Sequence, residues 1–203
     1  MYVPKYFAEE DQNTLYDFID HHGFGVLFST HDGAPAATHL PLTLDRNSGV
    51  LYGHFARQNP QWKDIAGQRA LAVFQGPHSY ISSSWYETPQ SVPTWNYVAV
   101  HVYGTVELIE DPAELLACLN DLVKQYEEPG SGYGIDETNL DFVRGLSQGI
   151  AGFKLKIDRI EGKWKLSQNH SKERRERVIE QLERIPSDNA KGIAKLMRDT
   201  LNQ

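Results

Sequence analysis

The stretch GHFARQNPQWKDI, residues 53–65, decides how this sequence is interpreted. It ends an expected strand and begins a short helix, with Asn59 as the N-cap and Pro60 at the first helical position. Arg57 and Lys63 lie at this junction. A helix N-terminus presents unpaired backbone N–H groups, so a junction that also carries cations is suited to a phosphate. We therefore predict a phosphate site here; the alternative is that the two cations are surface residues and Asn59 is only a cap.

Several kinds of donor are available at this junction. Arg57 can hold a phosphate through two parallel N–H···O bonds. Asn59 can donate through its side-chain amide unless the cap uses it, and the N–H groups of Gln61 and Trp62 lie in the first helical turn. Lys63 adds a point charge.

The segment FQGPHSYISSSWYETPQSVPTWNY, residues 74–97, is rich in Tyr, Trp, Ser and His and poor in charge. Such a segment suits a flat aromatic ligand, although a packed loop at a subunit interface has the same composition. Further on, Gln168 and Asn169 of LSQN (166–169) offer amides that suit a ring edge with mixed N–H and C=O groups; the alternative is a polar strand end. Together with the phosphate site, these features predict a pocket for a phosphorylated ring system, with flavin mononucleotide (FMN) as the leading candidate.

The order of the expected elements indicates a mainly β chain with added helices, in the α+β class. Many short strands come first, and helices gather at connections and at the C-terminus, which favours an antiparallel barrel or sandwich over a doubly wound sheet. Prolines within 35–44 argue against a central, fully paired strand there. We expect strands over 25–30, 50–56, 69–76 and 97–110, a strand and a turn at Gly162 within 153–169, a loop over 77–94, and helices over 9–22, 112–127, 138–148, 172–185 and from 187 or 188 onward.

Composition restricts the class of protein. A length of 203 residues suits one domain, or one domain with an appendage, and the single Cys118 excludes an intrachain disulfide and a Cys-based metal cage. The eight histidines show no metal-binding spacing, no G-x-G-x-x-G follows a strand, and no P-loop occurs. No apolar run reaches the roughly 20 residues of a membrane span, and the N-terminus does not resemble a signal peptide. We therefore expect a cytoplasmic protein without a metal.

Charge is unevenly distributed along the chain. Residues 154–203 hold 13 of the 20 basic and 8 of the 27 acidic residues, a net charge of +5, against −12 for residues 1–153. A basic C-terminal quarter is one signature of nucleic-acid binding. Because glutamates alternate with the cations, a solvated helix face is the favoured interpretation.

Six sequence blocks together resemble the PaiB family, whose members are described as FMN-binding negative transcriptional regulators. They occur in the expected order from residue 1 to about 170. The blocks are MYVPKYF (1–7), HLPL (39–42), GHFARQNPQW (53–62), YISSSWY (80–86), VPTWNY (92–97) and GKWKLSQN (162–169).

This resemblance implies an FMN-binding split β-barrel over residues 1–170 with a helical extension over 171–203, and a homodimer with flavin at the subunit interface. It also implies that residues 51–63 form the phosphate-binding strand and turn. The cofactor candidates carried over from the family are His54, Ala56, Arg57, Asn59, Trp62 and Lys63, followed by Trp95, Ser167, Gln168 and Asn169, which would act across the dimer.

Three functions are compatible with the sequence. The favoured one is a PaiB-type transcriptional regulator of protease production and sporulation, although Ile185-Pro186-Ser187 makes the last two helices a poor helix-turn-helix. The second is an FMN-dependent oxidoreductase acting on a small substrate, for which no catalytic acid or base stands out. The third is a cofactor-free dimeric interaction protein.

Overall fold

The computed structural model describes residues 1–128 and 130–201. Its strands form an eight-stranded sheet in the order β3-β2-β6-β7-β8-β5-β4, with β1 paired to β8. Five α-helices accompany this sheet in the described part of the chain, so the predicted α+β class is confirmed. The strands are β1 (Ala8–Glu9), β2 (Phe24–His31), β3 (Ala34–Pro41), β4 (Thr43–Asp45), β5 (Val50–Ala56), β6 (Arg69–Ile81), β7 (Thr94–Leu108) and β8 (Ile150–Lys165). The helices are α1 (Gln12–His21), α2 (Pro112–Tyr126), α3 (Leu140–Ser147), α4 (Lys172–Arg184) and α5 (Asp188–Asp199), with short 3₁₀ helices η1 (Lys5–Phe7), η2 (Pro60–Lys63) and η3 (Ser83–Trp85).

The chain divides into two compact units. The first unit comprises Met1–Leu15, Gln75–Val100 and Glu161–Gln203, and the second comprises Tyr16–Phe74 and His101–Ile160. Strands β6, β7 and β8 contribute residues to both. The barrel-and-extension boundary expected at residue 170 stays a prediction.

The second unit contains the β2–β3 hairpin and the β4–β5 pair. Asp32 and Gly33 turn the hairpin with positive φ angles of 49° and 73°, the conformation of a tight two-residue turn. Among the described strands, β3 pairs only with β2 and lies at the edge of the sheet, which explains how it accommodates its prolines. Strand β5 pairs antiparallel with β8, and the rings of Phe55 and Phe153 meet in the core at 5.0 Å between centroids.

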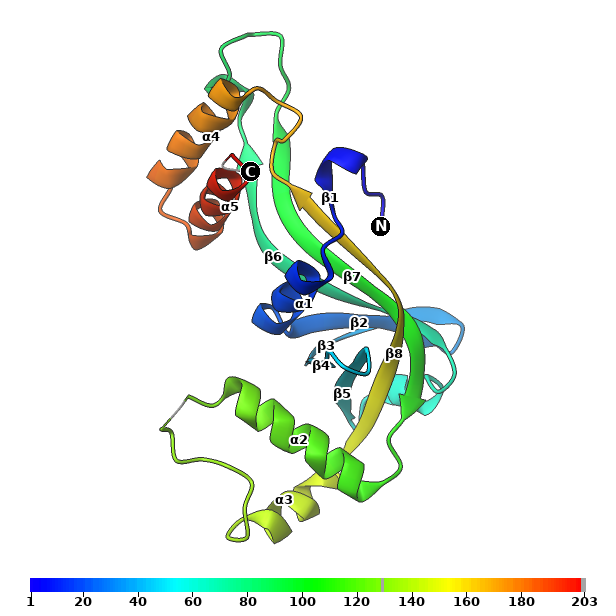
Figure 1. The fold of residues 1–203 in the computed structure, drawn as a ribbon. Helices are drawn as coiled ribbons and strands as arrows, with labels where there is room; N and C mark the ends of the chain where they lie inside the picture. The colour runs from blue at the N-terminus through cyan, green and yellow to red at the C-terminus, as the bar shows by residue number, and fades with distance from the viewer. Residues whose placement is uncertain (129, 202–203) are drawn as a thin grey trace. The chain divides into compact units, whose positions relative to one another are not determined.

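The first unit contains the two C-terminal helices, which lie side by side (Figure 1). The apolar stripes along which they face each other are buried. The buried members are Val178, Ile179 and Leu182 of α4 and Ala190, Ile193, Ala194 and Met197 of α5. A bidentate ion pair between Arg198 and Glu183, at 2.8 and 2.9 Å, joins the outer sides of the two helices.

Two expectations about strands were wrong. Strand β6 continues to Ile81 and β7 begins at Thr94, so the loop predicted over 77–94 is shorter at both ends. Strand β8 runs through Gly162 without a turn. Gly162 instead marks a close approach: a Cβ there would lie 2.4 Å from Leu15 Cδ2 and 2.9 Å from the carbonyl oxygen of Glu9. Crowding, and not a change of direction, requires this glycine.

Among the described helices, none is both long enough and apolar enough to cross a membrane.

Candidate functional site

The predicted phosphate junction follows β5 in the second unit. The backbone N–H of Arg57 donates to the Gly149 carbonyl at 2.8 Å, which ties the end of β5 to the start of β8. Helix η2 then begins at Pro60, and the Asn59 side chain accepts the N–H of Gln61 at 3.0 Å. The predicted cap and strand-to-helix turn are therefore confirmed.

The Arg57 guanidinium is held by the protein itself. Its Nε donates to the Gln148 carbonyl at 2.9 Å and its Nη2 to the Ile150 carbonyl at 2.7 Å. It also lies over the Trp62 ring, with 5.2 Å from Cζ to the ring centroid, and the Trp62 indole N–H donates back to the Arg57 carbonyl at 2.9 Å. The two-pronged phosphate grip expected of Arg57 would therefore have to use its remaining N–H groups, because Nε and one Nη2 proton already bond the backbone.

Asn59 and Gln61 belong to a buried polar network. Asn59 uses both ends of its amide, since Oδ1 caps η2 and Nδ2 donates to the Thr38 hydroxyl at 2.8 Å. The Thr38 hydroxyl in turn donates to Gln61 Oε1. Gln61 Nε2 donates to Ser29 Oγ at 2.9 Å and to the Leu27 carbonyl at 3.2 Å. The network fixes η2 to the β2–β3 hairpin, and it commits the amide of Asn59 that the sequence offered to a ligand.

The other candidates of this group line β5 and η2. His54 is half-buried, and burial lowers the pKa of its imidazole below the usual 6.5. Ala56 and Lys63 are exposed, and Lys63 makes no described side-chain bond. This group of candidates thus offers the ammonium of Lys63, which has no described partner, the fixed guanidinium of Arg57 and the neutral imidazole of His54.

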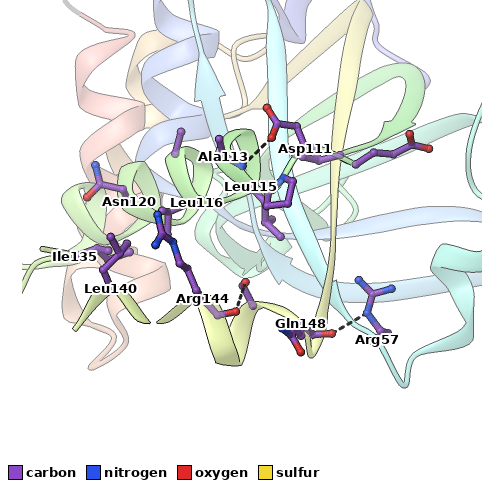
Figure 2. A pocket seen from close by; sticks show the side chains of 15 residues that line it. Arg57, Asp111, Ala113, Leu115, Leu116, Asn120, Ile135, Leu140, Arg144 and Gln148 are labelled. Atoms are coloured by element: carbon purple, nitrogen blue, oxygen red, sulfur yellow. Dashed lines mark hydrogen bonds between the residues drawn. The ribbon is translucent and has the colours of Figure 1, made fainter. Parts of the chain in front are cut away.

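A cleft of about 950 Å³ lies beside Arg57 in the second unit. Figure 2 shows Arg57 joined to Gln148 at one end, with Arg144 of α3 and the start of α2 along the wall. Its apolar lining comes from α2, α3 and their connection and includes Leu115, Leu116, Ile135 and Leu140. A cleft of this size with apolar walls and a few polar groups can take a small-molecule ligand.

The second group of candidates lies in the first unit. Trp95 is 47% exposed and contacts the rings of His78 and Tyr80. Ser167 is buried with a positive φ of 64°, and its hydroxyl bonds Asn96. The two groups of candidates therefore occupy different units, each of which is described by itself.

The amides of LSQN do not share one role. Gln168 folds back on its own turn, accepting the N–H of Leu166 at 2.8 Å and donating to the Trp164 carbonyl at 2.6 Å. Asn169 is exposed. Gln168 is therefore occupied in shaping the end of β8, whereas Asn169 is open to a ligand.

Sequence reasoning did not find several residues of this site. Gln148 and Ile150 hold Arg57 through carbonyl groups, which any residue supplies, and they lie about 90 positions away in sequence. Thr38 lies in β3, and nothing in the sequence distinguishes it from other strand residues. Its part in the site is shown only by its hydrogen bond with Asn59. No local signal could have indicated these partners.

Three potential metal ligands also lie together in the second unit: His31, Asp32 and Asp64 place ligand atoms within 4.8 Å of one another. His31 Nδ1 lies 2.9 Å from Asp64 Oδ1, and that hydrogen bond holds the pKa of the Asp64 carboxyl below its usual range. Asp64 also accepts the N–H of Asp32 at 3.2 Å, so it stabilises the hairpin turn. These bonds account for the arrangement without an ion.

Comparison with known proteins places the chain in a family. Residues 1–159 match the model of a family described as "Putative FMN-binding domain". The chain belongs to this family. It is also 41% identical over 207 residues to "Protease synthase and sporulation protein PAI 2" of Bacillus subtilis, a match that covers 100% of this chain and 99% of the relative. The resemblance to the PaiB family is thereby confirmed, and family membership supports FMN as the cofactor.

Solved structures agree on the fold. The flavocytochrome Anf3 from Azotobacter vinelandii matches with a TM-score of 0.62 at 18% identity, over 80% of this chain and 72% of that one. A FAD- and heme-binding protein from Mycobacterium smegmatis matches with a TM-score of 0.59 at 17% identity, over 78% and 73%. These likenesses confirm the predicted flavin-type split β-barrel, and at this identity they concern the fold alone.

Proposed function

We propose that this member of the FMN-binding domain family is a flavin-dependent regulator of the PaiB type. The observation that carries the proposal is the junction after β5, where Arg57 is held in place and Lys63 is unpaired beside the first turn of η2. The phosphate of FMN would accept from the remaining N–H groups of Arg57, from Lys63 and from the turn. The half-buried His54 and the indole of Trp62 would contact the rest of the cofactor, next to Ala56 and Asn59.

In this proposal the protein is a cytoplasmic homodimer. Trp95, Ser167, Gln168 and Asn169 would reach the flavin from the partner subunit. The exposed indole of Trp95 and the exposed amide of Asn169 support this role better than the buried Ser167 and the bonded Gln168 do.

An absorbance spectrum and an FMN titration test the cofactor. Lys63→Ala should weaken FMN binding by about 1.5–3 kcal/mol, the range for a charged hydrogen bond, without changing the fold. Lys124→Ala, a change of the same kind on exposed α2, is the control and should bind FMN like the unmodified protein. A colourless protein that does not respond to FMN would contradict the proposal and leave the cofactor-free interaction protein as the better description.

Regulation would act through contact with DNA or through a protein partner. Both routes are compatible with the C-terminal helices. Arg174 pairs with Glu87 and Arg198 with Glu183. Other cations of these helices, such as Lys191 and Lys195, make no ion pair with the described residues and could contact phosphates. Retardation of promoter DNA at low salt, lost as salt rises, would establish direct contact, whereas no retardation would leave a protein partner.

The oxidoreductase hypothesis is tested on the same sample. Bleaching of the flavin band by NADH or NADPH, followed by turnover, would favour an enzyme over a regulator. A flavin that these reductants leave unchanged would favour the regulator.

A further inference from the structure

The cleft of about 950 Å³ that begins beside Arg57 extends between helices α2 and α3. Each helix contributes two side chains at helical spacing: Leu116 and Asn120 from α2, and Leu140 and Arg144 from α3. Figure 2 shows these four side chains together at one end of the cleft and Arg57 at the other. Apart from Arg57, none of the flavin candidates lines the cleft. Its α2–α3 end is therefore available to a ligand other than the flavin.

The walls of the cleft are aliphatic. Leu115 and Leu116 of α2 line it together with Ile135 and Leu140. No Phe, Tyr, Trp or His occurs among the described residues of the lining. Flat aromatic ligands favour sites that contain aromatic rings, so an aliphatic chain is the apolar body that suits these walls best.

The two helices are incompletely covered in the free chain. No described residue of α2 or α3 is buried, although the 15 residues of α2 include Leu115, Leu116, Leu119, Leu122 and Val123. Most of the stability of a helix in a protein comes from packing its apolar face. A ligand that covers part of this apolar surface would remove it from water and should therefore stabilise the fold.

Arg144 supplies a cation with little local compensation. Its guanidinium lies 3.6 Å from Asp141, whose side chain is 99% exposed, and surface pairs of this kind are weak. The half-buried Asn120 makes no described side-chain bond, so its amide can donate to a ligand. The acidic residues of the lining, Glu110 and Asp111, lie directly before α2. An anionic group is therefore favoured at Arg144 and disfavoured at the start of α2.

We propose that the α2–α3 end of the cleft binds an aliphatic carboxylate, with the carboxylate bonded by Arg144 and the chain lying against the leucines of α2. A guanidinium matches a carboxylate through two parallel N–H···O bonds. The volume of the cleft is within the range of small-molecule sites. The proposal uses none of the flavin candidates, so it goes beyond the flavin site proposed at the junction of β5 and η2 and does not depend on it.

The test uses decanoate as the probe on the full chain, with binding followed by titration calorimetry and by thermal shift. Decanol and acetate are the matched probes, since the first has the chain without the charge and the second has the charge without the chain. We expect decanoate to bind saturably, to bind more tightly than either matched probe and to raise the melting temperature. No saturable binding of decanoate, or equal binding of decanol, would overturn the proposal.

Two variants test the place of binding. Arg144→Gln removes the charge and should weaken decanoate binding about tenfold, the effect of losing one charged hydrogen bond. Arg184→Gln, at an exposed arginine of α4 in the other unit, is the control and should bind decanoate like the unmodified protein. Ala117→Phe places a ring in the cleft from an exposed position, so it should block binding while the circular dichroism spectrum is unchanged. Unchanged decanoate binding in either cleft variant would overturn the proposal.

FMN and protein concentration separate this site from its alternatives. Decanoate should bind equally with and without saturating FMN, and a chain that binds decanoate but not FMN would refute only the flavin proposal. Displacement of decanoate by FMN would place the carboxylate in the flavin site and would overturn the present one. Decanoate binding that appears only when the protein is diluted would show that a second copy of the chain covers the cleft, and it would overturn the proposal as well.

Discussion

Gln61 should be among the most sensitive positions of the second unit, although nothing in the sequence sets it apart from neighbouring glutamines. Its side chain is 3% exposed and joins η2 to β2 through Leu27 and Ser29 and to β3 through Thr38. We consider Gln61→Leu, which keeps the approximate volume and removes every polar atom.

The magnitude follows from the bonds that would be lost. Gln61 Nε2 donates to Ser29 Oγ at 2.9 Å and to the Leu27 carbonyl at 3.2 Å, and its Oε1 accepts from the Thr38 hydroxyl. Each such bond contributes about 0.5–1.5 kcal/mol, and a buried partner left without a bond costs about 1–3 kcal/mol. Burial of the leucine side chain offsets part of this loss. The free energy of unfolding should therefore fall by about 2–4 kcal/mol.

Urea unfolding measures this change as a shift of the midpoint at constant slope, and a thermal melt should fall by about 4–16 °C for a chain of this size. Gln58→Leu is the matched control, because Gln58 is exposed and makes no described side-chain bond. It should change stability by less than about 0.5 kcal/mol. Equal effects of the two substitutions would refute the reasoning, since they would show that the network around Thr38 contributes nothing to stability.

Three further predictions follow from other parts of the structure. Gly162→Ala should lower the free energy of unfolding by about 1–3 kcal/mol, because the new methyl group meets the Glu9 carbonyl oxygen. Urea unfolding measures the change, and an unchanged midpoint would show that β1 is free to move. Burial lowers the pKa of folded His54 below 6.5, so the free energy of unfolding should be greatest above that pH and fall as pH decreases toward the folded-state pKa. His54→Gln should remove part of this fall, because burial also lowers the pKa of His22 and of His170; an NMR titration of His54 at or above 6.5 would contradict the prediction. Burial, with Glu114 and Asp121, raises the pKa of the Cys118 thiol from 9.0 to about 11, so alkylation at pH 8 should be about 100-fold slower than for a free thiol and should become fast in urea.

Local signals in the sequence predicted the elements that depend on local chemistry. Strand β5 over 50–56 agrees with its alternating pattern, and Asp111 caps α2 by accepting the N–H of Ala113 at 2.9 Å. The Asn59-Pro60 start of η2 also follows from residues adjacent in sequence. Each of these features is determined within one turn or one strand.

Features that depend on distant partners could not be predicted. Pro77 favoured a loop, yet β6 continues through it. The described pairing of β6 with β2 ends at Val73, so the edge of β6 that faces β2 is unpaired at Pro77 and the strand tolerates a residue without an N–H there. Gly162 signalled a turn, but its function is to admit Leu15 and β1. In both cases the residue type correctly indicated an unusual backbone position. Only the neighbouring residues in the folded chain show why a proline or a glycine is found there.

Arg57 shows how these two kinds of information combine at the candidate site. Its residue type and its place before η2 predicted a cation facing a phosphate, and the structure adds that two backbone carbonyls of the α3–β8 region already orient its guanidinium. An arginine held this way loses less side-chain entropy when a ligand arrives than a free arginine would. The intramolecular bonds therefore do not compete with a binding role: they occupy Nε and one proton of Nη2 and leave Nη1, as well as the charge, for the ligand. The same two bonds also join the end of β5 to the α3–β8 connection, so the guanidinium is fixed in place whether or not a ligand is bound.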